Sequence, residues 1–161
     1  MKLNRFIITW FGCGLVPLAP GTMGTIGTVP LAWILAQHFN PIYRLGFALI
    51  LTGFSFWVVG IDQIHTEVRD PQYVVIDETI GYLLSTVWLP ARWETFLLAF
   101  ILFRILDVVK PFPANYFDRC SKTANNAFWR GAHIVLDDVV AGLYAAFLCW
   151  IVFTYFYILP L

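Results

Sequence analysis

Between Arg5 and Arg44 the sequence contains no Asp, Glu, Lys or Arg, and a second charge-free stretch runs from Val139 to the end of the chain. Hydrophobic residues make up 60% of the 161 residues and charged residues 12%, about half of the roughly 25% found in soluble domains. A soluble protein of this size does not bury so much apolar surface. The chain is therefore predicted to lie in a membrane bilayer. Its balanced ten basic and ten acidic residues also argue against nucleic acid as a partner.

Prolines and polar segments divide the chain into several helices. Three prolines and three glycines over 16–30 predict a Pro/Gly-rich loop over 16–24. Several of the predicted helices are shorter than the ~20 residues of a full membrane span. The prediction is a single all-α domain over residues 1–161, an integral membrane bundle with several short or tilted helices. These helices are predicted over 5–15, 25–39, 42–61, 74–89, 93–109 and 138–159, with a polar region over 115–130.

Basic residues predict the orientation of this bundle. If the five longer helices alternate across a bacterial inner membrane from a cytoplasmic N-terminus, only Arg44 and Arg92 lie at the outer turns. The other basic residues then lie on the cytoplasmic side: Lys2, Arg5, Arg69, Arg104, Lys110, Arg119, Lys122 and Arg130. The sequence thus predicts a multi-pass protein whose functional site faces the cytoplasm.

Two acidic pairs interrupt otherwise apolar segments, Asp77-Glu78 and Asp137-Asp138, and Asp107 lies in a third. Carboxylates in membrane helices are costly to desolvate and occur mainly beside cations or metals. One pair alone would fit helix N-capping. Five carboxylates at one membrane face favour a metal site, and all-oxygen ligands favour Mg²⁺ over zinc. Small residues after each pair, Gly81 and Ala141-Gly142, would allow the helices to approach closely.

Cationic side chains accompany these acids. Arg104, Asp107 and Lys110 recur every three residues and so share one helix face. This pattern suits a phosphate held beside a metal ion, and the alternative is an interfacial ion pair with extended side chains. The glycine-rich segment 19–25 contributes backbone N–H groups that can bind a phosphate oxygen.

Four segments resemble, in order, the motif blocks of the phosphatidylglycerophosphatase A family: WFGCGLVPLAPGTMGT, VVIDETIGYLL, FRILDVVKPFPANYFDR and VLDDVVAGLYA. Members of that family are small bacterial inner-membrane enzymes that hydrolyse phosphatidylglycerol phosphate to phosphatidylglycerol. The blocks cover about residues 10–146. The resemblance implies a helical, Mg²⁺-dependent phosphatase in phospholipid synthesis, acting on this lipid at the cytoplasmic leaflet.

The resemblance also implies site residues. The acidic metal centre would consist of Asp77, Glu78, Asp107, Asp137 and Asp138. The candidate catalytic residues are Asp77, Glu78, Asp107, Lys110 and Asp138. The candidate substrate-binding residues are Pro20, Gly21, Thr22, Arg104, Lys110, Arg119 and Arg130. The chain departs from the family pattern at 129–135, where WRGAHIV replaces a glycine-rich stretch and Arg130 or His133 are candidates to replace its backbone contacts.

Hydrolysis of a phosphate monoester requires charge neutralisation and a positioned water. Mg²⁺ would bind a phosphate oxygen and the attacking water, while Lys110 and Arg104 offset the phosphate charge. Direct attack by water and an aspartyl-phosphate on Asp107 both remain open. The alternative function is a small cation-binding transporter or channel subunit. The sequence leaves the oligomeric state open.

Overall fold

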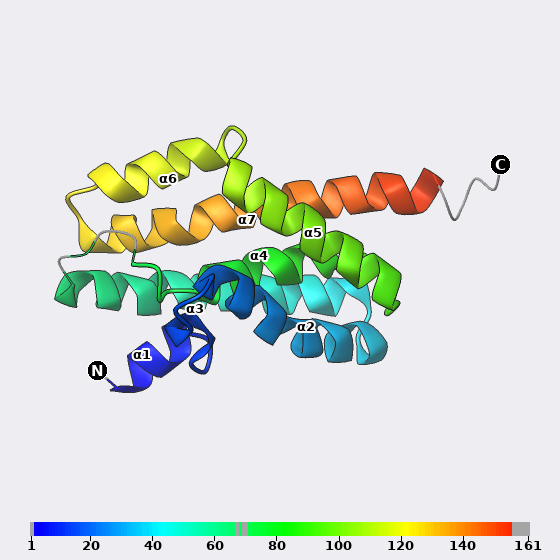
Figure 1. Cartoon of the computed structure of the whole chain (residues 1–161), viewed down its shortest axis with the longest axis horizontal. Coiled ribbons are helices and arrows are strands. Elements are labelled where there is room, and N and C mark those ends of the chain that lie inside the picture. The colour runs from blue at the N-terminus through cyan, green and yellow to red at the C-terminus, as the bar shows by residue number, and fades with distance from the viewer. Residues whose placement is uncertain (1, 67, 69–70, 156–161) are drawn as a thin grey trace.

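The fold is that of a computed structural model which describes residues 2–66, 68 and 71–155. The described residues are helical and contain no strand, which confirms the all-α prediction (Figure 1). The elements are α1 (Lys2–Ile8), η1 (Cys13–Leu15, a short 3-10 turn), α2 (Pro20–His38), α3 (Pro41–His65), α4 (Ile76–Thr86), α5 (Trp93–Val109), α6 (Ala114–Thr123) and α7 (Ala127–Phe153).

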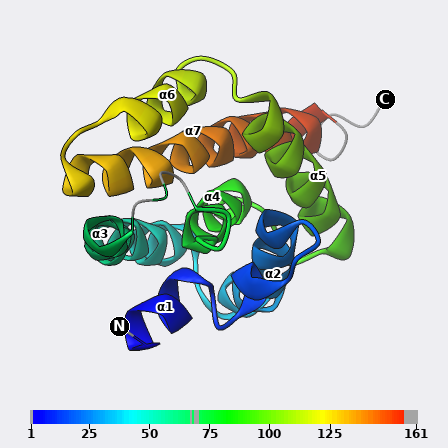
Figure 2. The same cartoon turned by 60° about the vertical axis from the view of Figure 1, so that its left-hand side comes forward.

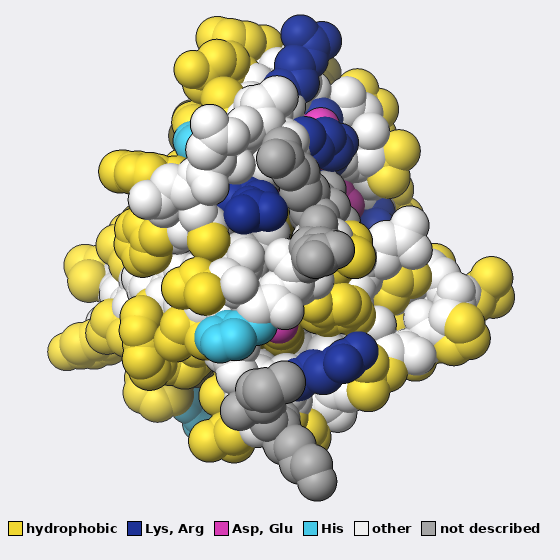
Figure 3. Space-filling model, turned by 90° about the vertical axis from the view of Figure 1, so that its left-hand side faces the viewer, with side chains coloured by type: hydrophobic (Ala, Val, Ile, Leu, Met, Phe, Trp, Pro, Cys, Tyr) yellow, Lys and Arg dark blue, Asp and Glu magenta, His cyan; other side chains and the backbone are white. Residues whose placement is uncertain are grey.

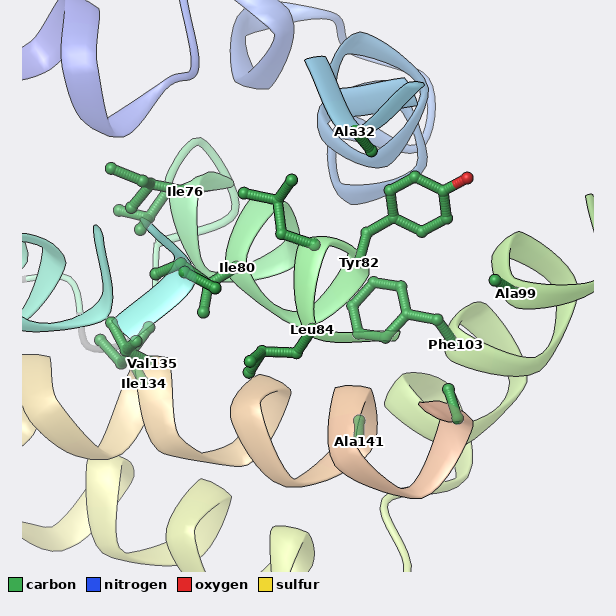
Figure 4. Close-up of a cluster of buried hydrophobic side chains, with 14 of the residues drawn as sticks. Ala32, Ile76, Ile80, Tyr82, Leu84, Ala99, Phe103, Ile134, Val135 and Ala141 are labelled. Carbon is green, nitrogen blue, oxygen red and sulfur yellow. The ribbon is translucent and has the colours of Figure 1, made fainter. Parts of the chain in front are cut away.

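Helix α4 lies at the centre of the bundle, with α2, α3, α5 and α7 around it (Figure 2). Every residue of this helix except Glu78 is buried, including the polar residues Asp77, Thr79, Ser85 and Thr86. In the core, Leu84 points toward α7 and Tyr82 lies toward Ala32 of α2 (Figure 4). The first turn of α4, which carries Asp77 and Glu78, therefore lies among the surrounding helices.

Glycines allow α4 and α7 to cross in close contact. A Cβ atom on Gly142 would lie 2.8 Å from the Cα atom of Gly81, closer than real Cβ atoms approach. This confirms the close approach predicted from the small residues after each acidic pair. Asp77 and Asp138 each precede their own glycine by four residues, about one helical turn. The crossing therefore places both acidic pairs at the same level of the bundle.

Two predicted boundaries near the N-terminus are wrong. Helix α2 begins at Pro20 and not at 25, so only the first part of the predicted loop over 16–24 exists as a loop. A proline fits the first position of a helix because its missing N–H has no intrahelical partner there. The predicted helix over 5–15 is also interrupted: α1 ends at Ile8, and positive φ angles at 10–12 precede the short turn η1.

The polar region over 115–130 contains helices that its composition concealed. It includes most of α6 and the start of α7, which begins at Ala127 and not at 138. Asn126 caps α7, because its side-chain oxygen accepts hydrogen bonds from the backbone N–H groups of Phe128 at 2.9 Å and Trp129 at 3.3 Å. Positions 156–159 of the predicted last helix lie outside the described residues.

Two helices among the described residues are long and apolar enough to cross a membrane, α3 and α7. The sequence-based prediction of five alternating spans is thus supported only in part. Arg44 donates hydrogen bonds to the carbonyl oxygens of Thr86 at 3.3 Å and Leu89 at 2.8 Å, at and just after the end of α4 that is farther from the acids. Lys and Arg side chains gather at the opposite end of the bundle (Figure 3). Arg69, predicted for that end, lies outside the described residues.

Candidate active site

Three carboxylates from two helices converge in the bundle. Asp77 and Glu78 lie in the first turn of α4, and Asp138 lies on α7. Each offers a carboxylate oxygen, and the three oxygens lie within 4.8 Å of one another. Asp77 and Asp138 are buried, with exposed fractions of 7% and 3%. Buried like charges at this separation repel one another strongly unless a cation or protons neutralise them.

Helix capping does not explain both acidic pairs. Asp77 and Glu78 occupy the first turn of α4, where acidic residues interact favourably with the helix dipole. Asp137 and Asp138, however, lie about three turns inside α7, which begins at Ala127. In both pairs the first aspartate accepts a hydrogen bond from the backbone N–H of the second residue, at 3.2 Å for Glu78 and 3.0 Å for Asp138. The second pair therefore calls for an explanation other than capping.

Arg104 and Asp107 bring a cation and a fourth carboxylate to the edge of this group. Their side chains form an ion pair at 2.8 Å between Nη1 and Oδ2 on the last turns of α5. The contact lacks the alignment of a hydrogen bond, so the buried Nη1 atom has no hydrogen-bond acceptor. Asp107 lies close enough for its charge to act on Glu78 and Asp138. The Arg104 guanidinium, paired with Asp107, thus lies beside the clustered acids.

The start of α2 completes this side of the site. A Cβ atom on Gly21 would overlap the Glu78 carboxylate and lie 3.2 Å from Arg104 Nη1. The first backbone hydrogen bond of α2 runs from Met23 N to Ala19 O. The N–H groups of Gly21 and Thr22 precede that bond, and such amides at a helix start bind anions well. Pro20, which occupies the first helical position, contributes no N–H group.

Lys110 connects the other aspartate of α7 to α6. Its ammonium nitrogen lies 2.6 Å from both Asp137 Oδ2 and Asp118 Oδ1, and Lys122 lies 2.7 Å from Asp118 Oδ2. Burial disfavours the charge on Lys110, but Asp137 and Asp118 outweigh that effect and raise the pKa of Lys110. Desolvation likewise opposes the Asp118 charge, and hydrogen bonds from Lys110 and Lys122 nevertheless lower the pKa of Asp118. Asp137 therefore lies in a cation-linked network next to the three carboxylates.

The remaining predicted residues lie farther from this group. Arg119 is exposed on α6, and Arg130 lies about two turns before Asp137 on α7. Within the described part of the chain, neither forms an ion pair with an acidic residue. Sequence reasoning missed Asp118, although its spacing of four residues from Lys122 is the signal for a helical ion pair.

Replacing Lys110 with methionine is expected to destabilise the protein by roughly 1–3 kcal/mol, because it removes the ammonium that holds Asp118 and Asp137. The matched variant Lys122→Met removes an exposed ammonium from the same Asp118 carboxylate and is expected to cost less than about 1 kcal/mol. Thermal unfolding in detergent at neutral pH measures both effects. Equal losses in the two variants would contradict a linking role for Lys110.

The family and its relatives bear on this arrangement. The model of the phosphatidylglycerophosphatase A family matches residues 6–153. The phosphatidylglycerophosphatase A of Escherichia coli (strain K12) is 33% identical over 139 residues, which cover 84% of this chain and 75% of that protein. The protein of the same name from Haemophilus influenzae is 34% identical over 136 residues, covering 84% of this chain and 79% of the relative.

A Bacteroides thetaiotaomicron protein, named provisionally as a phosphatidylinositol-3-phosphatase, is 31% identical over 152 residues, covering 89% of each chain. No solved structure matches the chain. All three relatives are phosphatases by name, so the transporter alternative gains no support. The resemblance found in the four sequence segments is confirmed, and the chain belongs to the phosphatidylglycerophosphatase A family.

Proposed function

We propose that the protein hydrolyses the terminal phosphate monoester of phosphatidylglycerol phosphate, releasing phosphatidylglycerol and inorganic phosphate for phospholipid synthesis. The observation that carries this proposal is the convergence of Asp77, Glu78 and Asp138 beside Arg104 and the start of α2. Anion-binding groups next to clustered carboxylates are the combination that metal-assisted phosphate chemistry requires. Membership of the family supports the choice of lipid.

Mg²⁺ is the proposed cofactor, and the donor set fits it. All three converging groups are carboxylates, and Glu78 Oε2 is buried without a hydrogen-bond partner. Oxygen ligands of this kind suit Mg²⁺, which usually binds one or two carboxylates together with substrate phosphate and water. Asp77, Glu78 and Asp138 would hold the ion, with Asp107 next to them. The bound ion would supply positive charge to a phosphate oxygen and to the attacking water.

The protein groups divide the remaining tasks. Arg104 and the N–H groups of Gly21 and Thr22 would bind phosphate oxygens and offset the charge that spreads over them during transfer. A carboxylate of the acidic group (Asp77, Glu78 and Asp138) would accept the proton of the attacking water and return a proton to the oxygen of the departing phosphatidylglycerol. Asp107 is the candidate nucleophile in the alternative route through an aspartyl-phosphate. Single-turnover reactions with radiolabelled substrate distinguish the two routes, because only the second transiently attaches phosphate to the protein.

We place the protein in a bacterial inner membrane with its site on the cytoplasmic side. Helices α3 and α7 have the length and composition of spans, and large apolar side chains such as Ile50 and Trp150 are exposed on them. Lys and Arg side chains gather where α3 ends and α7 begins (Figure 3), whereas Arg44 lies toward the other end. This asymmetry supports a cytoplasmic site, because basic residues concentrate on the cytoplasmic side of membrane proteins.

Removal of divalent metal is expected to abolish phosphate release. Purified protein in detergent micelles should release phosphate from phosphatidylglycerol phosphate with Mg²⁺, lose the activity with EDTA, and regain it when Mg²⁺ is added in excess. Phosphatidic acid and phosphatidylinositol 3-phosphate serve as comparison substrates, the latter because of the name of the third relative. Release that is insensitive to EDTA would contradict the metal, and faster release from a comparison lipid would contradict the proposed substrate.

A further inference from the structure

Asp118 is a carboxylate near the candidate active site to which the proposed function gives no role. It lies on α6, and its side chain is 16% exposed. Two ammonium groups contact it: Lys110 Nζ lies 2.6 Å from Oδ1, and Lys122 Nζ lies 2.7 Å from Oδ2. Lys122 belongs to the same helix, whereas Lys110 follows the last turn of α5. The contact with Lys110 therefore joins two separate parts of the bundle.

The position of Asp118 is fixed by the packing of α6 against α7. Helix α6 lies on the side of α7 that faces away from α4 (Figures 1 and 2). The ring of Phe117, the residue before Asp118, stacks on the ring of His133 of α7 with centroids 6.1 Å apart. In the turn before α6, the Phe112 carbonyl oxygen accepts a hydrogen bond from the Tyr144 hydroxyl of α7 at 2.9 Å. Asp118 is thus held on the outer side of α7.

A series of contacts connects Asp118 to the proposed metal ligand Asp138. The Lys110 ammonium lies 2.6 Å from Asp137 Oδ2 as well as 2.6 Å from Asp118 Oδ1. The other carboxylate oxygen of Asp137 accepts a hydrogen bond from the backbone N–H of Asp138 at 3.0 Å. Asp137 is only 6% exposed, and polar contacts are stronger in such a water-poor environment. Asp118 is therefore connected to the acidic group through one lysine and one aspartate.

The Lys110 ammonium competes with a metal ion for the acidic group. It carries the same sign of charge as Mg²⁺ and is attracted by the same carboxylates. Asp107 lies three residues before Lys110, and Asp138 directly follows its partner Asp137. A lysine side chain is flexible and its three donors rotate, so one partner alone orients it weakly. A second carboxylate on the outer side of α7 draws the ammonium away from the acidic group.

We infer that Asp118 is a positioning residue for the proposed Mg²⁺ site. It holds the Lys110 ammonium between α6 and α7 and balances its charge, so that the acidic group remains open to a divalent ion. The inference rests on the proposed function and adds a residue outside the acidic group that controls metal affinity. Lys122 is not required for this role, because its exposed ammonium contacts Asp118 from within the same helix.

The test compares Asp118→Asn with Lys122→Met, which removes the exposed partner of the same carboxylate. Metal-free protein in detergent micelles is titrated with Mg²⁺, and the rise in Tm gives the Mg²⁺ affinity without turnover. Phosphate release from phosphatidylglycerol phosphate gives the Mg²⁺ concentration for half the maximal rate.

In Asp118→Asn both measurements should show a roughly tenfold weaker Mg²⁺ affinity, because an unbalanced ammonium opposes the ion. The kcat at saturating Mg²⁺ should change by less than about threefold, since the groups that contact the phosphate are unaltered. In Lys122→Met the Mg²⁺ affinity should stay within about twofold of the wild-type value, because an exposed ion pair contributes little.

A second comparison shows whether the effect acts through Lys110. In a Lys110→Met background, Asp118→Asn should change the Mg²⁺ affinity by less than about threefold, because no ammonium remains to be held. Asp118→Glu restores the carboxylate and should recover most of the affinity that Asp118→Asn loses. The comparison in the Lys110→Met background also applies if Asp118→Asn alone does not fold, since the double variant contains no unbalanced Lys110 ammonium.

Wild-type Mg²⁺ affinity in Asp118→Asn would overturn the inference, even if the Tm of the metal-free variant falls, because Asp118 would then have a structural role only. An equal loss of affinity with and without Lys110 would also overturn it, since Asp118 would then act on the ion by its own charge. The absence of any Mg²⁺ effect on the Tm of the wild-type protein is a third contrary result. If Mg²⁺ raises that Tm but no phosphate is released, the proposed function fails, and the measured affinities still decide the role of Asp118.

Discussion

Replacing Asp138 with asparagine is expected to lower kcat for phosphate release by roughly 10²–10⁴-fold, the range associated with loss of a catalytic carboxylate. Asp138 is the member of the acidic group contributed by α7, and its carboxylate lies within 4.8 Å of carboxylate oxygens from Asp77 and Glu78. Asparagine keeps the shape of the side chain but removes the charge. The variant should therefore keep its helical content and lose its affinity for a divalent ion.

The stability of the same variant separates a functional role from a structural one. Without metal, Asp138→Asn should be at least as stable as the wild-type protein, because it removes one of several mutually repelling buried charges. Mg²⁺ should raise the Tm of the wild-type protein and leave that of the variant nearly unchanged. Asp62→Asn is the matched control, since Asp62 accepts a hydrogen bond from Tyr73 outside the acidic group. Full turnover by Asp138→Asn would show that Asp138 has no role in the site.

Replacing Gly142 with alanine is expected to disrupt the contact between α4 and α7. The added Cβ would lie 2.8 Å from Gly81 Cα and would force α7 away from α4. Overpacking of this kind costs typically 1–3 kcal/mol. Because Asp138 lies one turn from the contact, separation of the helices would also move its carboxylate away from Asp77 and Glu78. A loss of kcat/KM of more than about tenfold is expected, since small misplacements of reacting groups are costly.

Gly53→Ala provides the comparison. Gly53 lies within α3, and a Cβ atom there would meet nothing within 4 Å. Alanine should therefore be neutral or stabilise the helix by up to about 1 kcal/mol through its higher helix propensity. Thermal unfolding and phosphate release of Gly142→Ala and Gly53→Ala are compared in the same detergent. Wild-type behaviour of Gly142→Ala would mean that the two helices do not cross at this contact.

The sequence was sufficient to predict those parts of the fold in which apolar runs end at clear breaks. The predicted helix over 93–109 coincides with α5, and 42–61 lies within α3, because Asn40-Pro41 and the prolines after Lys110 mark their limits. The acidic pairs and the small residues after them were sufficient to predict that two helices cross beside carboxylates. These features are local in the sequence, and their physical meaning does not depend on distant residues.

Features that depend on partners far apart in the chain could not be predicted in this way. The start of α2 is rich in glycine, which disfavours helix in isolation, yet these glycines allow α2 to pack against Val75 and Glu78. Lys110 lies between Asp118 of α6 and Asp137 of α7, and its position in the sequence does not reveal these two partners. Tertiary packing decides both outcomes, and neither is encoded in a spacing that can be recognised beforehand.

The burial of α4 has a consequence for membranes of different thickness. Lipid-facing helices respond to a thicker or thinner bilayer by changing their tilt. Glu78 is the one residue of α4 that lies outside the buried core. A change in bilayer thickness therefore acts on α4 through the neighbouring helices. Helix α7 exposes Leu143 and Phe147, but it meets α4 at Gly81 and Gly142, one turn from both acidic pairs. Tilting of α7 about that contact would displace its far ends most and its aspartates least.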